Sequence, residues 1–344
     1  MLRPMSIQLT LVVPDMLNGV TPVHAQEAVA GGQAGVEALE WLLTLAERRP
    51  HPGSEYAGWI WQQAGQREPV PVAELSYRYD FGVSPPGPVL RADPVCLEAD
   101  RDCVRLSAAP LPMLEPAESR QLVDEINEQF IDEPWSLVSA NTERWYLLLE
   151  EDAGLRTCNP ERVRGRDIHD FMPTGERHPY WRKIINEIQM LMFNSPVNHR
   201  RRSQAALMAN SLWLWGEGEM PPTLSLPWVA LYTSDPVVAG MGLRAGLPVA
   251  PCPSTAQELL DILPTEGCFL CQPAFPAAQQ WLVAFNHDWG LPIYKALQRR
   301  LLGSHPSQQL ATVELLTANG VSYHLTAGKR RWWRRRRRID TFQQ

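Results

Sequence analysis

Long apolar runs are missing from this sequence of 344 residues. No stretch approaches the ~18 consecutive apolar residues that a membrane-spanning helix needs, so we expect no transmembrane segment. The residues after Met1 resemble a secretory signal, but Gln8, Pro14 and Asp15 interrupt the apolar stretch that such a signal keeps continuous. The sequence therefore predicts a cytoplasmic protein.

Metal-ligand spacings are scarce as well. Among six cysteines, only Cys268 and Cys271 are spaced as a metal-binding pair, with no second CxxC and no His-x-His partner nearby. A structural zinc site needs about four such ligands. We interpret the cysteines as reduced residues of a cytoplasmic core, with a zinc site at Cys268 and Cys271 as the alternative.

Positive charge is scarce outside one segment. The formal net charge is −6, but residues 329–338 alone carry eight positive charges, so the rest of the chain sums to −14. An acidic body is a poor surface for nucleic acid. The basic segment holds Trp332 and Trp333 inside its arginine run, which makes it a candidate for binding nucleic acid or an anionic membrane surface. The sequence favours a flexible, solubilising tail over 329–344, with such binding as the alternative.

The remaining composition indicates a globular protein of the α/β class. Hydrophobic residues make up 44% and charged residues 20%, as in globular chains. Strand-like and helix-like segments alternate, which is typical of a mainly parallel sheet covered by helices on both faces. We expect strands at 6–13, 89–95, 104–106, 135–138, 144–149, 210–215, 228–233, 268–271, 281–285, 311–316 and 321–325. We expect helices at 36–46, 116–130, 180–194, 237–245, 258–263 and 291–302, and a loop at 77–87.

The middle of the chain is expected to form an insertion. A strand, a helix and a strand pair between 97 and 155 would make a compact α+β unit. The α/β core would then consist of 1–96 and 156–328, followed by the basic tail at 329–344.

Two early polar residues are candidates for chemistry. Asp15 follows the first predicted strand, and α/β folds place ligand groups at the carboxyl ends of strands. Its alternative role is to cap the next turn. Ser54 follows Pro52 and Gly53 at a predicted helix start, where backbone N–H groups favour an incoming phosphate, so it is a candidate nucleophile. The residue types alone favour a helix cap at Ser54.

Two sets of charged residues invite a ligand hypothesis. Arg91 and Asp93 lie two residues apart in a predicted strand, so their side chains share one face. They either pair with each other or hold an anionic ligand together with a metal or water. The run Arg200–Arg202 is interpreted as a solvated turn, with a phosphate clamp as the alternative.

The most distinctive stretch is Asn210–Gly218, with the sequence N-S-L-W-L-W-G-E-G. Leucines alternate with tryptophans and two glycines follow, which predicts a strand buried on both faces that runs into a turn close to a neighbour. The stretch is similar to one in archaeal-type cofactor-independent phosphoglycerate mutases, members of the alkaline phosphatase superfamily. Residues 233–242 resemble the strand and glycine-rich helix that come next in those enzymes.

Three further motifs extend the resemblance. Together with Asn210–Gly216 they appear in the same order in the RpfE-type regulatory proteins of proteobacteria, which resemble phosphoglycerate mutases and have a poorly defined biochemical role. Four motifs in order, spread over roughly residues 88–300, are more specific than any one of them. The further motifs are Arg91–Val95 (R-A-D-P-V), Arg144–Leu147 (R-W-Y-L) and Asp170–Gly175 (D-F-M-P-T-G).

The resemblance implies an alkaline-phosphatase-like fold and assigns roles by position. Asp15 stands where those enzymes have a metal ligand at the end of the first strand. Ser54, in Gly53-Ser54-Glu55, is the one comparable site for the phosphoryl-accepting serine. The metal would be divalent, such as manganese or zinc, and the ligand a small phosphorylated compound. The candidate ligand-binding residues are Arg91, Asp93, Asn210, Trp215, Gly216 and Gly218.

The late part of the chain departs from the enzymes. They need a late cluster of Asp and His that includes an Asp-His pair, whereas the adjacent pair here is His287-Asp288, in the reverse order. Two metals a few Å apart take about six or more protein ligands. We therefore expect a retained scaffold with degraded catalytic sites, that is, a phosphoglycerate-mutase-like regulatory protein that binds a small phosphorylated ligand. The alternative is an active metal-dependent phosphoglycerate mutase or phosphatase that uses Ser54.

Overall fold

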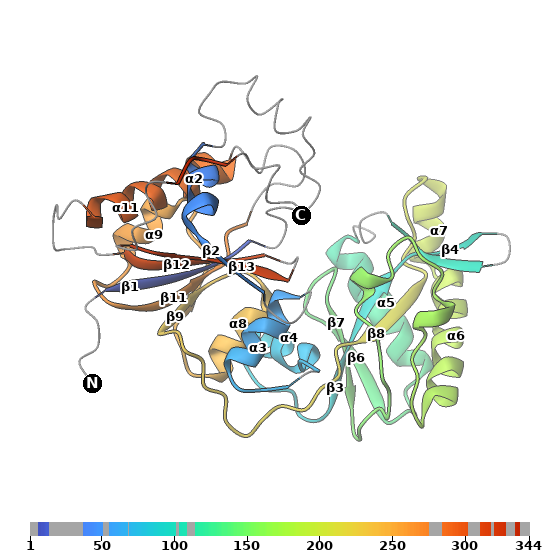
Figure 1. Ribbon diagram of the computed structural model, residues 1–344. Coiled ribbons are helices and arrows are strands. Elements are labelled where there is room, and N and C mark those ends of the chain that lie inside the picture. Colours follow the sequence, from blue (N-terminus) through green and yellow to red (C-terminus); the bar gives the residue numbers. More distant parts are fainter. Residues whose placement is uncertain are drawn as a thin grey trace. The chain divides into compact units, whose positions relative to one another are not determined.

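The computed structural model divides the chain into two compact units, which are described separately (Figure 1). The first unit combines 1–67 with 223–344, and the second is 68–222. The residues that the structure describes are 6–13, 37–50, 55–67, 69–100, 103–108, 114–274, 284–301, 310–317, 320–327 and 334–337.

The first unit is built on a seven-stranded sheet with the order β10-β9-β11-β1-β12-β13-β2. The strands from β10 to β12 are parallel, and β13 and β2 are antiparallel to their neighbours. The predicted mainly parallel sheet flanked by helices is therefore confirmed. The strands are β1 (Ile7–Val12), β2 (Glu47–Pro50), β9 (Ala230–Tyr232), β10 (Val249–Ala250), β11 (Gly267–Cys271), β12 (Leu310–Leu316) and β13 (Val321–Thr326).

Helices cover both faces of this sheet (Figure 1). On one face lie α2 (Glu37–Leu45), α9 (Ala256–Ile262), a π-helical turn η3 (Phe285–Gly290) and α11 (Leu291–Leu301), which share one apolar core with the strands. On the other face lie α3 (Tyr56–Gln63) and α8 (Pro236–Arg244). There the rings of Trp59 and Trp228 lie 6.0 Å apart, and the indole N–H of Trp228 donates to Thr10 of β1 at 3.2 Å.

The second unit is built on a four-stranded antiparallel sheet with the order β6-β7-β3-β8. The strands are β3 (Val89–Val95), β6 (Trp135–Ser139), β7 (Trp145–Leu149) and β8 (Ser211–Trp215), and a separate hairpin joins β4 (Leu97–Asp100) to β5 (Cys103–Leu106). The helices are α4 (Val72–Phe81), α5 (Pro116–Gln129), α6 (His178–Asn194), α7 (Pro196–Ser203) and the short turns η1 (Pro160–Arg162) and η2 (His169–Phe171).

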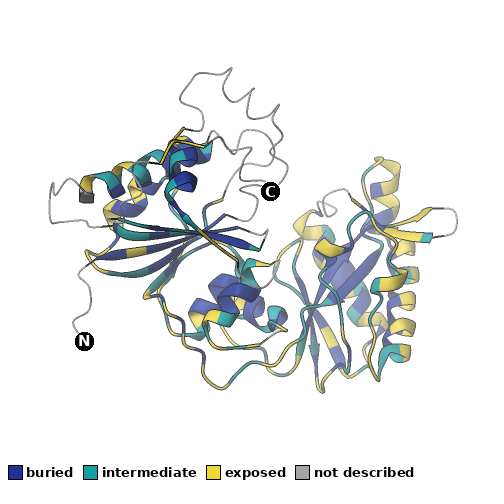
Figure 2. Cartoon of the chain, in the orientation of Figure 1, coloured by how far each residue is buried: buried dark blue, intermediate teal, exposed yellow. Residues whose placement is uncertain are grey.

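The boundaries of this unit differ from the expected insertion. The predicted range 97–155 lies inside it, but the unit also takes in β3 and β8, because β3 pairs with β7 on one side and β8 on the other. Its core gathers residues from all four strands and from α5 and α6. In Figure 2 the strands are largely buried, whereas α6 buries one face and exposes the other.

Several local predictions need correction. The expected loop at 77–87 is helical as far as Phe81, where α4 ends at Gly82 in the left-handed conformation. Arg200–Arg202 lies in helix α7 instead of a turn. The N-cap of α3 is Glu55, one residue after the serine that we expected to cap it. The strand expected at 281–285 is wrong at its two described residues, because Ala284 is helical and Phe285 begins the π-helical turn.

Within the described residues, no helix combines the length and the apolar character that crossing a membrane requires.

Candidate functional site

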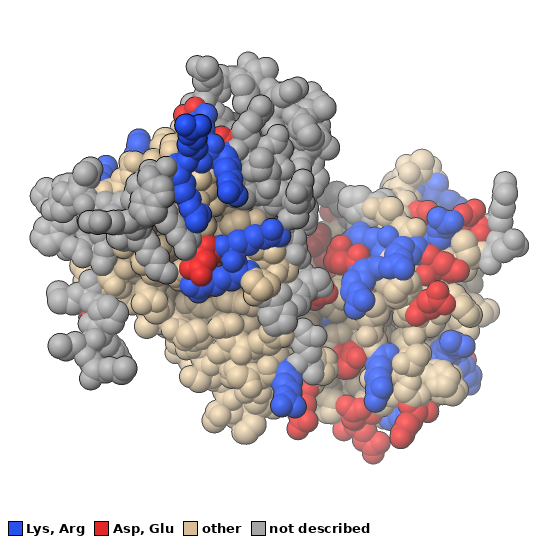
Figure 3. Space-filling model, in the orientation of Figure 1, with Lys and Arg blue, Asp and Glu red and all other residues tan. Residues whose placement is uncertain are grey.

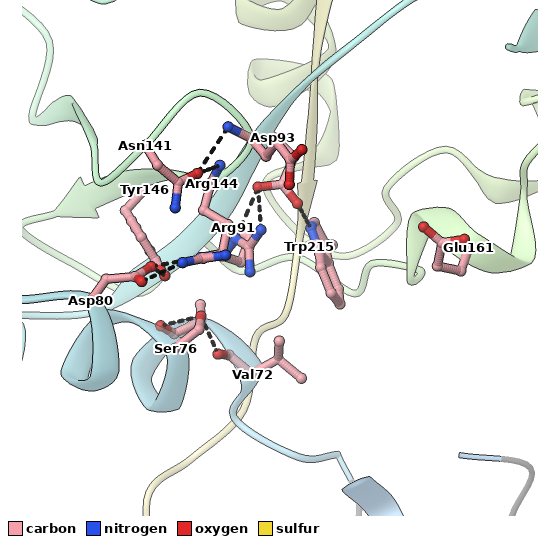
Figure 4. Close-up of polar contacts among 12 residues, drawn as sticks. Val72, Ser76, Asp80, Arg91, Asp93, Asn141, Arg144, Tyr146, Glu161 and Trp215 are labelled. Carbon is pink, nitrogen blue, oxygen red and sulfur yellow. Dashed lines mark hydrogen bonds and ion pairs between the residues drawn. The ribbon is translucent and has the colours of Figure 1, made fainter. Parts of the chain in front are cut away.

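Arg91, Asp93 and Trp215 form a buried hydrogen-bonded cluster in the second unit (Figure 4). The Arg91 Nε and Nη2 atoms donate to Oδ1 of Asp93 at 2.9 and 2.7 Å. The indole N–H of Trp215 donates to the other carboxylate oxygen at 2.7 Å. Arg91 is only 6% exposed and Asp93 only 4%. Of the two arrangements that the strand spacing predicts, the structure shows the direct pair.

The strand register explains why these side chains meet. Arg91 and Asp93 alternate with Ala92 in β3 and so project from the same face. In the antiparallel pairing of β3 with β8, Arg91 lies opposite Trp215. Burial raises the pKa of the Asp93 carboxyl, while the Arg91 guanidinium and the N–H groups of Trp215 and Trp145 act to lower it. The donors around the carboxylate offset part of its loss of water, and burial remains the largest cause, so the pKa of Asp93 is raised.

A second polar group packs against this cluster. Two N–H groups of Arg144 donate to Asp80 at 2.8 and 2.6 Å, and the Tyr146 hydroxyl donates to the same carboxylate at 2.6 Å. The Arg91 guanidinium carbon lies 5.4 Å from the Tyr146 ring centroid and 5.3 Å from that of Trp215. Arg91 is therefore held by a carboxylate and by two aromatic faces, and such contacts favour the cation.

The glycines after β8 allow a close backbone approach, as predicted. Gly216 has φ +83°, and a β-carbon there would lie 3.1 Å from the backbone nitrogen of Ala73. A β-carbon at Gly218 would lie 2.7 Å from the Cα of Pro71. The Ala73 N–H donates to the Gly216 carbonyl at 2.9 Å. The neighbour of the turn is thus the start of α4.

The other residues of the stretch also bond within the unit. Asn210, at the far end of β8 from the glycines, donates to the Leu97 carbonyl at 2.8 Å and accepts from the Leu97 N–H at 2.7 Å. The Glu217 carboxylate accepts from the Thr157 N–H at 2.7 Å and from the Thr157 hydroxyl. The structure therefore gathers Arg91, Asp93, Trp215 and Gly216, leaves Gly218 against α4 and places Asn210 elsewhere. Their ligand-binding role stays a prediction.

The first unit places a polar network at the carboxyl ends of β9 and β11, where α/β folds bind ligands. The Tyr56 hydroxyl donates to Oδ2 of Asp235 at 2.6 Å and also bonds to the Gln272 side chain. The Thr233 hydroxyl donates to Gln272 at 2.8 Å and accepts from the Asp235 N–H at 3.0 Å. Burial and the Asp235 charge raise the pKa of Tyr56, so its hydroxyl stays a donor. Asp15 and Ser54 lie outside the described residues.

Asp235 in this network is also a helix cap. Its Oδ1 accepts from the N–H groups of Val237 and Val238, each at 2.9 Å, and Pro236 follows it at the first helical position. An Asp-Pro pair after a strand is the signal from which this cap was predictable. No local pattern in the sequence indicates its bond to Tyr56, which is 179 residues away.

The described residues do not supply a site for the divalent metals that the resemblance implies. Among them, no group of three or more His, Cys, Asp and Glu residues gathers as metal ligands. Cys268 and Cys271 both lie in β11, where positions three apart face opposite sides of the sheet. The exposed His287 bonds to the adjacent Asp288 at 2.7 Å. His324 lies within β13, opposite Glu314 and Glu47 of the flanking strands.

Tyr56→Phe is expected to lower the free energy of unfolding by about 1.5 kcal/mol, because it removes a hydrogen bond to a charged acceptor. Urea unfolding curves of the full chain would measure the change. Tyr232→Phe removes a hydroxyl elsewhere in the same unit and is the matched control. Equal effects of the two substitutions would contradict a specific tie between α3 and Asp235.

Part of the chain is similar in sequence to known proteins. No family model matches the chain. The 2,3-bisphosphoglycerate-independent phosphoglycerate mutase of Methanosarcina barkeri is 27% identical over 141 residues, which are 38% of this chain and 35% of that relative. A probable enzyme of the same name from Geobacter sulfurreducens is 31% identical over 101 residues, 28% of this chain and 25% of its own length. The matched part is thus well under half of each relative.

Two solved structures also resemble the chain at low sequence identity. The cofactor-independent phosphoglycerate mutase of Thermoplasma acidophilum gives a TM-score of 0.47 at 13% identity, covering 93% of this chain and 90% of its own. A Pyrococcus horikoshii protein gives 0.48 at 14% identity, covering 95% and 88%.

The fold and site define a mixed α/β protein whose mainly parallel sheet is interrupted in sequence by an antiparallel unit. The chain is homologous to the cofactor-independent phosphoglycerate mutases.

Proposed function

We propose that this chain is a phosphoglycerate-mutase-like regulatory protein of the RpfE type, which binds a small phosphorylated ligand without turning it over. The homology supports the scaffold, and the four ordered motifs support the regulatory family. The activity for which the relatives are named belongs to proteins of which this chain matches a quarter to about two fifths.

One observation carries this proposal: the carboxylates of the described candidate sites are hydrogen-bonded to neighbouring groups of the protein itself. The Asp93 carboxylate accepts hydrogen bonds from Arg91 and Trp215. The Asp235 carboxylate accepts hydrogen bonds from Tyr56 and from two backbone N–H groups of α8. Phosphoryl transfer through a serine needs carboxylates and imidazoles that are available to bind metal ions and offset the charge of the transition state. Carboxylates committed to structural hydrogen bonds favour a retained scaffold over a working catalytic centre.

The second candidate is an active metal-dependent phosphoglycerate mutase or phosphatase. The names of the curated relatives favour it, and its nucleophile would be Ser54 with Asp15 as a metal ligand. Manganese or zinc would neutralise the transferring phosphoryl group and lower the pKa of the serine.

The purified full chain and its Ser54→Ala variant separate the two candidates. We expect no phosphoglycerate isomerisation or aryl-phosphate hydrolysis above background with added manganese or zinc, and we expect 3-phosphoglycerate to raise the melting temperature equally in both proteins. Glycerate, which lacks the phosphoryl group, is the matched control and should leave the melting temperature unchanged. Metal-dependent turnover that Ser54→Ala abolishes would refute the regulatory proposal.

A further inference from the structure

Two free cysteines of the first unit lie in contact with each other. Cys271 is fully buried at the end of β11, and Cys252 is partly buried and packs against the same apolar core. The two thiols are hydrogen-bonded to each other. Their contact is not visible in the sequence, because helix α9 lies between them along the chain.

The sheet explains why these cysteines meet. In the strand order β10-β9-β11, Tyr232 of β9 lies between Ala250 of β10 and Cys271 of β11. After β10 the chain continues to α9, whose apolar face belongs to the same core as Cys271. Cys252 lies in this connection, which brings its thiol to that of Cys271.

The local sequence holds Cys252 in place, because it stands between Pro251 and Pro253. A proline fixes its own φ angle and restricts the residue before it to extended conformations. The backbone at Cys252 therefore has few alternatives to the conformation that presents its thiol to Cys271. Two groups that are already held in contact lose little further conformational freedom when a bond forms between them.

The surroundings of the pair decide which thiol meets an oxidant first. Burial and the contact with Cys252 raise the pKa of Cys271, so that thiol stays protonated. Cys252 keeps part of its surface in solvent, where an oxidant reaches it. The chain around it is uncharged from Ala245 to Gln257, and Figure 3 shows broad areas without acidic or basic side chains on the visible face of this unit. Such a site suits a small neutral oxidant better than a bulky charged one.

We propose that Cys252 and Cys271 form a redox-active pair that hydrogen peroxide converts into a disulfide. One oxygen of the peroxide is transferred to the Cys252 sulfur, which becomes a sulfenic acid, and the other oxygen leaves as water. The Cys271 sulfur then attacks the sulfenic sulfur. The S–S bond forms, the S–O bond breaks, and the hydroxyl leaves as a second water with the Cys271 proton. The two thiols thus lose two electrons and two protons, which reduce one peroxide to two waters.

The disulfide closes a loop of the chain that contains α9. A cross-link of this kind stabilises the folded state mainly by restricting the unfolded chain. Cys271 is followed directly by Gln272, whose side chain accepts from Thr233 in the polar network at the carboxyl ends of β9 and β11. Oxidation therefore fixes the part of the sheet on which this network stands. The inference does not depend on the proposed function, because it needs neither a phosphorylated ligand nor turnover.

Treatment of the full chain with one molar equivalent of hydrogen peroxide tests the proposal. We expect the free thiols, counted in denaturant, to fall from six to four. Mass spectrometry of a digest should show Cys252 linked to Cys271, and dithiothreitol should restore all the thiols. The oxidised chain should unfold at a higher urea concentration than the reduced chain.

Cys252→Ser is expected to abolish both the cross-link and the rise in the urea midpoint. Cys268→Ser is the matched control and should keep both, because Cys268 is also partly exposed but faces the opposite side of the sheet from Cys271. Circular dichroism shows whether each variant is folded, and Cys252→Ala serves if the serine variant is not. Unchanged thiols, a Cys252 sulfinic acid beside a free Cys271, or a cross-link that persists in the Cys252 variants would each overturn the proposal.

Discussion

Asp93→Ala is expected to lower the free energy of unfolding by about 3–5 kcal/mol, because it leaves the Arg91 guanidinium buried without its carboxylate. The substitution also removes the acceptor of the Trp215 indole N–H. Urea unfolding of the full chain, followed by circular dichroism, would measure the loss. Because the chain has two compact units, the effect should fall on the transition of 68–222 if the units unfold separately.

The matched control removes both charges. Arg91→Met with Asp93→Leu should destabilise less than Asp93→Ala alone, because no unpaired charge remains buried. If Asp93→Ala lowers the free energy of unfolding less than the double variant does, the result would contradict a structural role for the pairing of Arg91 with Asp93. Tighter binding of 3-phosphoglycerate by Asp93→Ala would instead show that Arg91, once freed from its partner, receives the phosphoryl group.

Gly218→Ala is expected to destabilise the second unit by about 1–3 kcal/mol, as overpacking of a close contact does. Its β-carbon would lie 2.7 Å from Cα and 2.8 Å from the nitrogen of Pro71. Both are backbone atoms, so no side-chain rotation relieves the clash. The midpoint of urea unfolding would show the change.

Gly290→Ala is the control, because its β-carbon would meet no atom closer than 3.6 Å, an ordinary contact distance. It should leave the midpoint nearly unchanged or raise it slightly, since alanine favours helical backbone. A wild-type midpoint for Gly218→Ala would mean that the start of α4 moves aside at little cost. The glycine would then not be required for this close approach.

The elements that could be predicted from the sequence are those in which the spacing of apolar residues matches the positions that the fold buries. The strand Ser211–Trp215 buries its first four residues, as its alternating Leu and Trp residues predicted. The face shared by Arg91 and Asp93 followed from the period of two in a strand. The same rule, applied to a CxxC within a strand, would already have argued against a zinc site at Cys268 and Cys271.

The parts that were missed depend on contacts between distant residues. Helix α4 was missed because polar residues occur throughout its length. Its ring contact with Tyr146 forms only in the folded unit, where the ring centroids of Tyr77 and Tyr146 lie 5.3 Å apart. Arg201 looked like one of three solvated arginines, yet it is buried and pairs with Glu118 at 2.6 Å. That pairing joins residues 83 positions apart, which no local pattern reveals. The hydrogen bond between Tyr56 and Asp235 was not predictable for the same reason.

The contact between the glycine turn and α4 has a consequence for how the chain is assembled. The Ala73 N–H bonds to the Gly216 carbonyl, and Gly218 lies against Pro71, so the chain enters and leaves 68–222 at adjacent points. All seven strands of the mainly parallel sheet come from outside this range. The second unit is therefore an insertion in the larger α/β unit, and contacts between its own first and last segments close it. We expect a chain in which a short linker joins Arg67 to Thr223 to keep the strand order of the larger sheet.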